Sequence, residues 1–404
     1  MIERENNMFE LSKDKLKELG AEITTREIKQ QPQLWKETAE ILAQNQERLA
    51  LFFDQIKKAA NGKRVRVIFT GAGTSQYVGD TAVPYLNEYG DNDHFIFHSF
   101  GTTDIVSSPK EFLFPDEPTL LVSFARSGNS PESVATVKIA NEQIKTLFHL
   151  TITCAKEGQL AKNAATDERN FLLLMPEKSN DAGFAMTGSF TCMLLSALWV
   201  FDQTAVEKKE SYLQQLIRTG EDLISRDQEI QKLLPKSFER IAYLGSGSLA
   251  GATREAQLKI LELTAGKVAT IFDSSMGFRH GPKSFLNSET LVIGFVNNQP
   301  YTRNYDLDIL EEIKDDQITT NVIAIAQPGN IDFTGTSLLL EASISLPDAY
   351  LALPMIMTAQ IIALDTSIKV ANKPDTPSPT GTVNRVVKGV IIHEYVNKGE
   401  TKDE

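Results

Sequence analysis

The sequence predicts an α/β fold with two related halves. Short apolar runs alternate with helix-like segments along most of the 404 residues, which is typical of parallel sheets covered by helices. This alternation occurs twice, with a period of about 175 residues, far longer than that of a solenoid repeat. A glycine-rich turn follows the first strand of each copy. A chain of this length is expected to form two domains or two closely packed halves.

Residues 1–60 are expected to form a helical extension, since apolar residues such as Leu49, Phe52 and Ile56 recur there at helical spacing. Residues 61–205 form the first domain, which closes with a long apolar helix over 187–202. Its strand candidates are 66–70, 95–99, 120–124, 150–154 and 171–175.

After a charged helical connector at 206–235, the pattern restarts in a second domain at 236–385. The sequence of residues 241–249 resembles that of residues 68–75. The later strand candidates of this domain are 269–273, 291–296 and 321–326, which echo 95–99, 120–124 and 150–154. Residues 386–404 form a C-terminal tail. Three prolines between 371 and 389 predict an extended segment that can return over a pocket.

Composition and charge exclude several classes of protein. The net charge of −12 and the pI near 5.1 argue against a nucleic-acid-binding surface. Two cysteines, Cys154 and Cys192, lie in apolar runs and are expected to be buried free thiols, as in a reducing compartment. The N-terminus has no apolar signal-peptide core, and no uninterrupted apolar stretch reaches transmembrane length. We therefore expect a cytoplasmic protein without a membrane partner, a metal or another cofactor.

Two strand-to-helix junctions in the first domain suit a phosphate. Residues 127–132 read Ser-Gly-Asn-Ser-Pro-Glu directly after an apolar strand, and 71–75 read Gly-Ala-Gly-Thr-Ser. Hydroxyls, close backbone N–H groups and helix N-termini together bind dianions. Parallel strands end at the same edge of a sheet, where α/β proteins bind ligands. Helix capping by Ser130 is the alternative explanation of that junction alone.

The second domain differs at the corresponding places. After the 291–296 strand come Asn297 and Asn298 instead of serines, so phosphate binding is expected in the first domain only. The turn at 245–250 fits a loose dinucleotide-binding pattern, with Asp273 after the next strand. We consider this match weak, because the duplication explains the same glycines.

The second domain has its own candidates for chemistry. Glu255, Lys259 and Glu262 share one helix face, either as a solvated surface with a salt bridge or as part of a site. His280 lies in a glycine-flanked irregular segment, where an imidazole can shuttle protons. Lys388 lies among apolar neighbours in the tail.

These motifs resemble the sugar-isomerase (SIS) domain, as two tandem copies after residue 60. The Lys-Ile-Leu-Glu at 259–262, the His-Gly-Pro at 280–282 and the Asn-x-x-x-Lys at 384–388 are similar to the isomerase half of glucosamine-6-phosphate synthase. The stretches 279–285 and 187–191 resemble the tagatose-6-phosphate ketose/aldose isomerase family, whose members are also described as galactosamine-6-phosphate deaminases. We expect no counterpart of the glutamine amidotransferase domain of the synthase, and Ala-Arg-Ser at 125–127 replaces its Ser-Gln-Ser.

The resemblance implies a reaction and roles for the candidate residues. The expected reaction converts D-galactosamine 6-phosphate to D-tagatose 6-phosphate and ammonia. Glu262 would move the carbon-bound proton, His280 would open the sugar ring, and Lys388 would neutralise developing charge. Residues expected to bind the phosphate are Thr74, Ser75, Arg126, Ser127, Asn129 and Ser130. Further substrate contacts are expected from Gly73, Ser189, Lys259 and Glu255.

The resemblance also implies a homodimer or higher homo-oligomer, because related isomerases take the histidine from a neighbouring subunit. Two other functions stay open. One is an aldose-ketose isomerase of a neutral hexose 6-phosphate, and the other is a non-enzymatic sugar-phosphate sensor. Because residues 1–60 offer no basic recognition helix and the chain is acidic, the sensor is the less favoured of the two.

Overall fold

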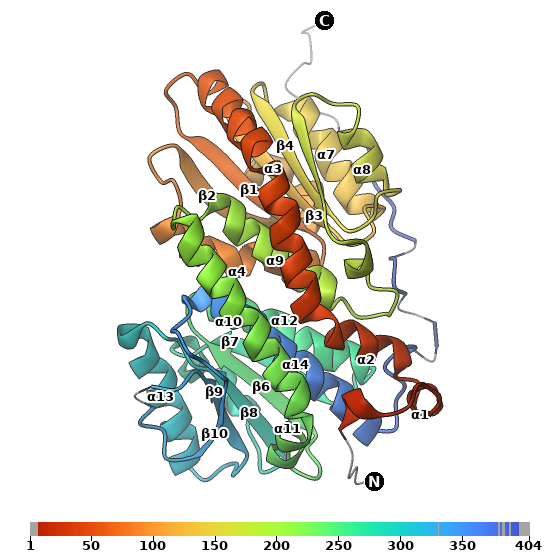
Figure 1. Cartoon of the computed structure of the whole chain (residues 1–404), viewed down its shortest axis with the longest axis vertical. Helices are drawn as coiled ribbons and strands as arrows, with labels where there is room; N and C mark the ends of the chain where they lie inside the picture. Colours follow the sequence, from red (N-terminus) through yellow and green to blue (C-terminus); the bar gives the residue numbers. More distant parts are fainter. Residues whose placement is uncertain (1–6, 330, 379, 382–383, 388, 396–404) are drawn as a thin grey trace, which may run out of the picture.

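The chain has two halves, and each half is built around one five-stranded sheet in which every pair of neighbouring strands is parallel (Figure 1). The structure is a computed structural model that describes residues 7–329, 331–378, 380–381, 384–387 and 389–395. The strands of the first sheet are β1 (Val65–Gly71), β2 (Phe95–Gly101), β3 (Thr119–Ala125), β4 (Leu147–Thr153) and β5 (Asn170–Leu174). Those of the second are β6 (Arg240–Gly245), β7 (Ala269–Ser274), β8 (Thr290–Phe295), β9 (Val322–Ala326) and β10 (Thr336–Leu339). The predicted α/β class with two helix-flanked parallel sheets is confirmed.

The two sheets have the same topology. Their strand orders are β2-β1-β3-β4-β5 and, read from the other edge, β7-β6-β8-β9-β10. The first helix of each half, α4 (Thr74–Tyr89) and α12 (Ser248–Leu263), has 16 residues. Each is preceded by a glycine, Gly73 or Gly247, with φ of 56° and ψ near −127°, a conformation that only glycine adopts readily. The duplication predicted from the sequence is therefore visible down to the backbone of one turn.

The N-terminal extension is helical, as expected, and it spans both halves. Its elements are η1 (Met8–Glu10), α1 (Lys13–Leu19), α2 (Glu22–Lys29) and α3 (Gln31–Ala59). Helix α3 packs against the first half, whereas α1 and α2 lie beside the second (Figure 1). The extension therefore ties the two halves together.

The remaining helices cover the sheets or connect the halves. Those of the first half are α5 (Thr102–Ser107), α6 (Pro109–Phe112), α7 (Pro131–Gln143), α8 (Gln159–Ala164), η2 (Glu177–Ser179) and α9 (Gly188–Phe201). The connector consists of α10 (Val206–Ser225) and α11 (Asp227–Leu233). The second half adds η3 (Gly277–Arg279), η4 (Pro282–Phe285), α13 (Pro300–Asp315) and α14 (Asp348–Lys369).

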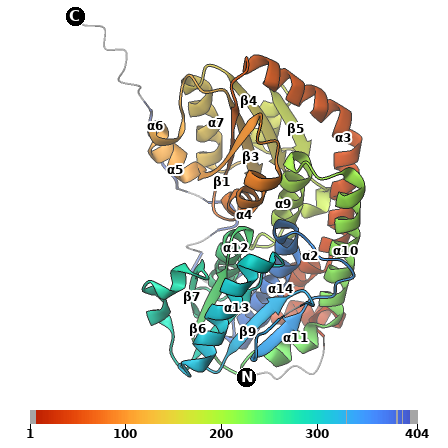
Figure 2. The same ribbon diagram turned by 90° about the vertical axis from the view of Figure 1, so that its left-hand side faces the viewer.

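Helices α4, α9, α12 and α14 pack against one another between the two sheets (Figure 2). Helix α14 is long and apolar enough to cross a membrane by length and composition, although polar residues such as Gln360 and Asp365 interrupt its apolar sequence. Its most apolar window is 94% buried inside the fold, so α14 is a central core helix. Both cysteines are buried and unpaired, as predicted.

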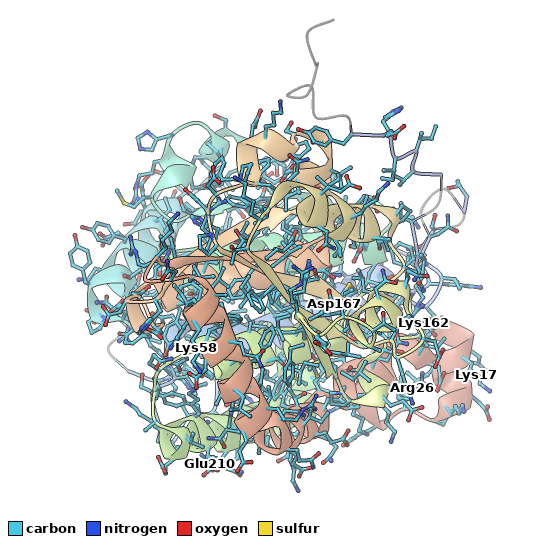
Figure 3. The ribbon with its side chains drawn as sticks, turned by 90° about the horizontal axis from the view of Figure 1, so that it is seen from above. Lys17, Arg26, Lys58, Lys162, Asp167 and Glu210 are labelled. Carbon is cyan, nitrogen blue, oxygen red and sulfur yellow. The ribbon has the colours of Figure 1, made fainter. Side chains whose placement is uncertain are left out.

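The surface carries charges of both signs. Three of the charged side chains labelled in Figure 3, those of Lys58, Lys162 and Glu210, come from separate helices, α3, α8 and α10, and lie at the exterior. The fifth strand of the second sheet, β10, was not predicted from the sequence, because it has only four residues and two of them are exposed. A short, partly exposed edge strand has no strong apolar pattern.

Candidate active site

The two predicted phosphate loops lie side by side. Strands β1 and β3 pair in parallel, from Arg66 opposite Thr119 to Thr70 opposite Ser123, so the turns that follow them occupy the same edge of the sheet. Helix α4 begins at Thr74 on one turn, and α7 begins at Pro131 on the other. Two helix N-termini, each with unpaired backbone N–H groups, therefore open onto a common space.

The serine hydroxyls of these loops are largely uncommitted. Ser130 is the N-cap of α7, yet its side chain makes no capping bond. Ser75 Oγ is 4.0 Å from Met186 Sδ, and among the described residues Ser127 Oγ accepts only a long bond of 3.3 Å from the Asn129 backbone N–H. Capping alone therefore does not account for Ser130, and the hydroxyl groups remain available to a ligand.

Helix α8 holds the second loop in place. Asn129 Oδ1 accepts from the Gln159 backbone N–H at 2.9 Å, and the Gly128 carbonyl accepts from Leu160 N–H at 3.1 Å. Gly128 has a φ of 66° and its Cα approaches Gly158 closely, so a side chain there would be strained. The Asn129 side-chain oxygen, predicted to bind phosphate, is thus engaged in shaping the loop.

Helix α12 brings an ion-pair cluster from the second half to the first loop. Lys259 Nζ lies 3.2 Å from Glu255 Oε1 and 2.6 Å from Glu262 Oε2, and it donates to Thr74 Oγ1 at 3.2 Å. The shared helix face predicted from the spacing is confirmed. The solvated-surface alternative is wrong for Glu255 and Lys259, whose side chains are fully buried.

Burial and charge set the protonation of this cluster. Burial raises the pKa of Glu255 to about 7, against the opposing effect of Lys259. Burial alone would lower the pKa of Lys259, but the two glutamates outweigh it and the pKa is raised. Lys259 therefore stays a cation between two acids. The side chain of Glu262 is 22% exposed, so its carboxylate is the member of the cluster that is open to a ligand.

The structure places Lys259 and Glu255 behind Glu262 and Thr74. Both are fully buried and contact these neighbours, so they are placed to orient them; the direct substrate contact expected of them stays a prediction. Glu262 in turn lies within electrostatic reach of Arg126, which follows β3. The acid of the second half and both loops of the first half therefore surround one space.

Two other residues expected to contact the ligand, Arg126 and Ser189, make hydrogen bonds within the protein. Arg126 is buried and donates to the backbone carbonyls of Gly183, Phe184 and Arg385, at 3.2, 3.0 and 2.6 Å. The Ser189 hydroxyl is completely buried and donates to Asp181 at 2.6 Å. Both residues thus hold the segment 180–189 in place.

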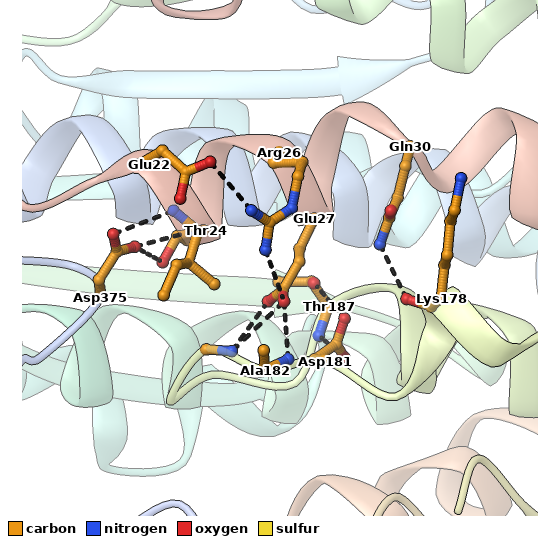
Figure 4. A network of polar contacts seen from close by, with 12 residues as sticks. Glu22, Thr24, Arg26, Glu27, Gln30, Lys178, Asp181, Ala182, Thr187 and Asp375 are labelled. Carbon is orange, nitrogen blue, oxygen red and sulfur yellow. Dashed lines mark hydrogen bonds and ion pairs between the residues drawn. The ribbon is translucent and has the colours of Figure 1, made fainter. Parts of the chain in front are cut away.

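Sequence reasoning missed the residues that fix this segment (Figure 4). The Glu27 carboxylate of α2 accepts from the backbone N–H groups of Ala182, at 2.7 Å, and Gly183. Burial and the nearby Asp181 raise the pKa of Glu27 to about 7. Asp181 itself caps the first turn of α9 by accepting from Thr187 N–H at 2.8 Å. Glu27 and Ala182 are 155 residues apart in the chain, so no local pattern signals their pairing.

The C-terminal segment contacts the first half through Arg385. Arg385 Nε donates to the Asp181 carbonyl at 2.8 Å, and its Nη2 donates to Asn180 Oδ1 at 3.0 Å. Asp375 accepts from Thr24 at the start of α2 (Figure 4). Lys388, predicted to be catalytic, lies outside the described residues.

His280 is exposed at the end of η3, and in the described part of the chain its imidazole makes no hydrogen bond or ion pair. Gly73, the N-cap of α4, is exposed at the first loop, and a Cβ on it would meet no atom within 4 Å. The structure thus leaves room at Gly73 for a ligand to approach the backbone.

The corresponding place in the second half is filled by a carboxylate. Asp306 of α13 accepts from Ser246 Oγ at 2.6 Å, from Ser275 Oγ at 2.5 Å and from Asn297 N–H at 3.0 Å. These donors follow β6, β7 and β8, so they are the ones that an anion at this edge would use. This arrangement supports the expectation of phosphate binding in the first half only.

Known proteins share the sequence and the fold of this chain. A family model described as the SIS domain matches residues 62–201. A D-galactosamine-6-phosphate deaminase AgaS of Escherichia coli is 43% identical over 382 residues, covering 92% of this chain and 96% of that protein. The crystal structure of tagatose-6-phosphate ketose/aldose isomerase from Escherichia coli superimposes with a TM-score of 0.83 at 40% identity, covering 92% of this chain and 96% of the other. The C-terminal domain of glucosamine-fructose-6-phosphate aminotransferase from Francisella tularensis shares the fold, with a TM-score of 0.70 at 19% identity over 90% of this chain and 99% of that one.

Proposed function

The chain belongs to the SIS-domain family of galactosamine-6-phosphate deaminases and tagatose-6-phosphate ketose/aldose isomerases, and from this membership we propose that it converts D-galactosamine 6-phosphate and water to D-tagatose 6-phosphate and ammonia. The relatives are enzymes that act on sugar phosphates, and the match extends over nearly the whole chain. The expected setting is the catabolism of amino sugars in the cytoplasm.

One observation carries the proposal. The ion-pair cluster on α12 contacts the amino end of α4 through Lys259 and Thr74, so that Glu262 faces the space beside the phosphate loops. A hexose 6-phosphate whose phosphate lies against Ser75, Ser127 and Ser130 would extend its remote carbons from that point. Binding energy at the phosphate then orients the reacting carbons toward the acid.

The reaction needs one base and water. After ring opening, the Glu262 carboxylate removes the proton from C2 of the aminoaldose, and a proton is delivered to C1. The product is an imine at C2, which water hydrolyses to the ketone while the nitrogen leaves as ammonia. The buried Lys259 holds the Glu262 carboxylate in place by its 2.6 Å ion pair. Lys388 is proposed to stabilise the oxyanion that develops at C1.

His280 is proposed to open the sugar ring in the site of a neighbouring subunit. Its exposed imidazole, with no partner in the described chain, is suited to that role. We therefore propose a homodimer with shared active sites. Mixing Glu262→Gln chains with His280→Ala chains should leave one intact site in each hybrid dimer, so a hybrid should show about half of the wild-type activity and a random equal mixture about a quarter, whereas neither variant alone turns over.

The substitution Glu262→Gln tests the proposal. Loss of a general base costs about 10²–10⁴-fold in rate, while the phosphate loops stay intact, so turnover should vanish and binding of sugar phosphate should persist. Ammonia and tagatose 6-phosphate are measured together, with Glu210→Gln on the outer surface as the matched control. Normal turnover of galactosamine 6-phosphate by Glu262→Gln would refute the assignment.

A plain aldose-ketose isomerase is the second candidate, favoured by the name of the structural relative from Escherichia coli. The same base would serve it, but no nitrogen would leave. Ammonia release from galactosamine 6-phosphate, compared with interconversion of neutral hexose 6-phosphates, separates the two functions.

A further inference from the structure

We propose that the chain has a second sugar site between its halves, which binds a hexose or hexosamine that carries no phosphate. The site is a cavity of about 400 Å³, within the size range of small-molecule pockets. Helices α4, α10 and α12 and the turns before α13 and α14 line it. The residues used below are Tyr85, Glu88, Tyr89, Lys208, Ser248 and Thr302.

This cavity is the internal counterpart of the candidate active site. That site lies where α4 begins and β3 ends, and α12 forms its other wall. The second cavity lies where α12 begins, at Gly247 and Ser248, and where β8 ends, at Asn297, and its other wall is α4. The two helices exchange roles, as a pseudo-twofold relation between the halves requires.

The correspondence between α4 and α12 holds for individual residue positions. Helices α4 and α12 have equal length and begin at Thr74 and Ser248, so they can be aligned residue by residue. Glu88 then occupies the position in α4 that Glu262 occupies in α12. Tyr85 likewise takes the position of Lys259. An acid therefore stands at the same place in both cavities, and in the second one it is exposed.

The second cavity is less suited to a phosphate than the first site, because carboxylates already bind the hydroxyl and backbone donors that follow β6, β7 and β8. Asp306 takes the hydroxyls and the backbone N–H at the ends of β6, β7 and β8. Asp348 takes the backbone N–H of Asn298, at 2.6 Å. Of these two carboxylates Asp348 lines the cavity, so a phosphate here would meet its negative charge. The ligand is therefore a sugar without that group.

The remaining lining suits a sugar ring. Tyr85 and Tyr89 stack with ring centroids 4.5 Å apart, and Tyr89 is 45% exposed. Such a ring offers an apolar face to sugar C–H groups. Glu88, Lys208 and Thr302 supply a carboxylate, an ammonium and a hydroxyl for the polar edge, which fits a polyol better than an apolar ligand. The choice of a sugar also rests on the proposed function of the first site.

The test is a calorimetric titration of the full-length protein with D-galactosamine, with and without saturating galactitol 6-phosphate. That open-chain phosphate has no carbonyl to isomerise and occupies the first site. We expect one saturable galactosamine site per chain that persists under saturation. Disappearance of the heat, or no saturable binding at all, would overturn the second site. Failure of the proposed function is seen separately, as absence of galactitol 6-phosphate binding or of turnover.

Two exposed positions connect binding to the cavity. Tyr89→Ala should weaken galactosamine binding about tenfold by removing the stacking surface, and Glu88→Gln should weaken it in the same direction. Tyr301→Ala, an exposed tyrosine of α13 that does not line the cavity, is the matched control and should bind normally. Unchanged affinity of Tyr89→Ala, with a normal circular dichroism spectrum, would contradict the proposal.

Discussion

Replacing Lys259 by methionine should destabilise the protein strongly, since it removes the only cation from the buried cluster on α12. Lys259 is fully buried and lies 3.2 Å from Glu255 and 2.6 Å from Glu262. Breaking a buried ion pair by removing one partner costs about 3–5 kcal/mol, and we expect a loss of that size at pH 8.

The loss should depend on pH in a defined direction. Burial raises the pKa of Glu255 to about 7, so the folded chain holds this proton more tightly than the unfolded chain, and the stability that the proton provides is lost as pH rises through 7. Because Lys259 opposes this shift, Lys259→Met raises the pKa of Glu255 further. The deficit of the variant should therefore grow by about 1 kcal/mol between pH 6 and pH 8.

Urea denaturation followed by far-ultraviolet circular dichroism measures both effects. The double variant Lys259→Met/Glu255→Gln should recover about half of the lost stability or more, since no uncompensated buried carboxylate remains at position 255. A loss below about 1 kcal/mol for the single variant, or a double variant no more stable than the single one, would refute the reasoning about this cluster.

Three further predictions test the duplication and its asymmetry. Gly73→Ala and Gly247→Ala should each lower the free energy of unfolding by about 1–3 kcal/mol through backbone strain. Only Gly73→Ala should also raise the KM for the sugar phosphate. Equal effects of the two substitutions on KM would contradict a phosphate site confined to the first half. Asp306→Ala should lower the free energy of unfolding by about 3 kcal/mol, since it leaves several buried donors unpaired, and should leave KM unchanged; urea titration and initial rates check both. Burial and Asp181 raise the pKa of Glu27 to about 7, so the stability it provides is lost as pH rises from about 4.5 to about 7; Glu27→Gln should flatten the pH profile of thermal unfolding, and an unchanged profile would count against this assignment.

The sequence predicted the sheet because its strands are buried and apolar on both faces. Strand β3 is buried along all seven residues, and its apolar run is bounded by turn residues. The face of α12 followed from spacing alone. The central position of α14 was not predicted, since a long apolar helix looks the same from sequence whether it crosses a membrane or fills a core.

The site was predicted less completely than the fold. The loops and Glu262 follow from local motifs, and the structure brings them together. Arg126 and Ser189 were expected to bind ligand, yet they hold the segment 180–189. Ser189 bonds Asp181 within the segment itself, but the contacts of Arg126 and Glu27 with the segment join residues far apart in the chain. Such pairings depend on the packing of whole elements and leave no local signal.

A crystal structure of the Glu262→Gln variant with D-galactosamine 6-phosphate tests most directly whether the two halves build one site around one sugar. We predict the phosphate against Ser75, Ser127 and Ser130 and the C2 carbon within about 3–3.5 Å of the side chain at position 262. A sugar phosphate held by the same serines with its C2 carbon well beyond reach of that side chain, or bound elsewhere on the protein, would contradict the account.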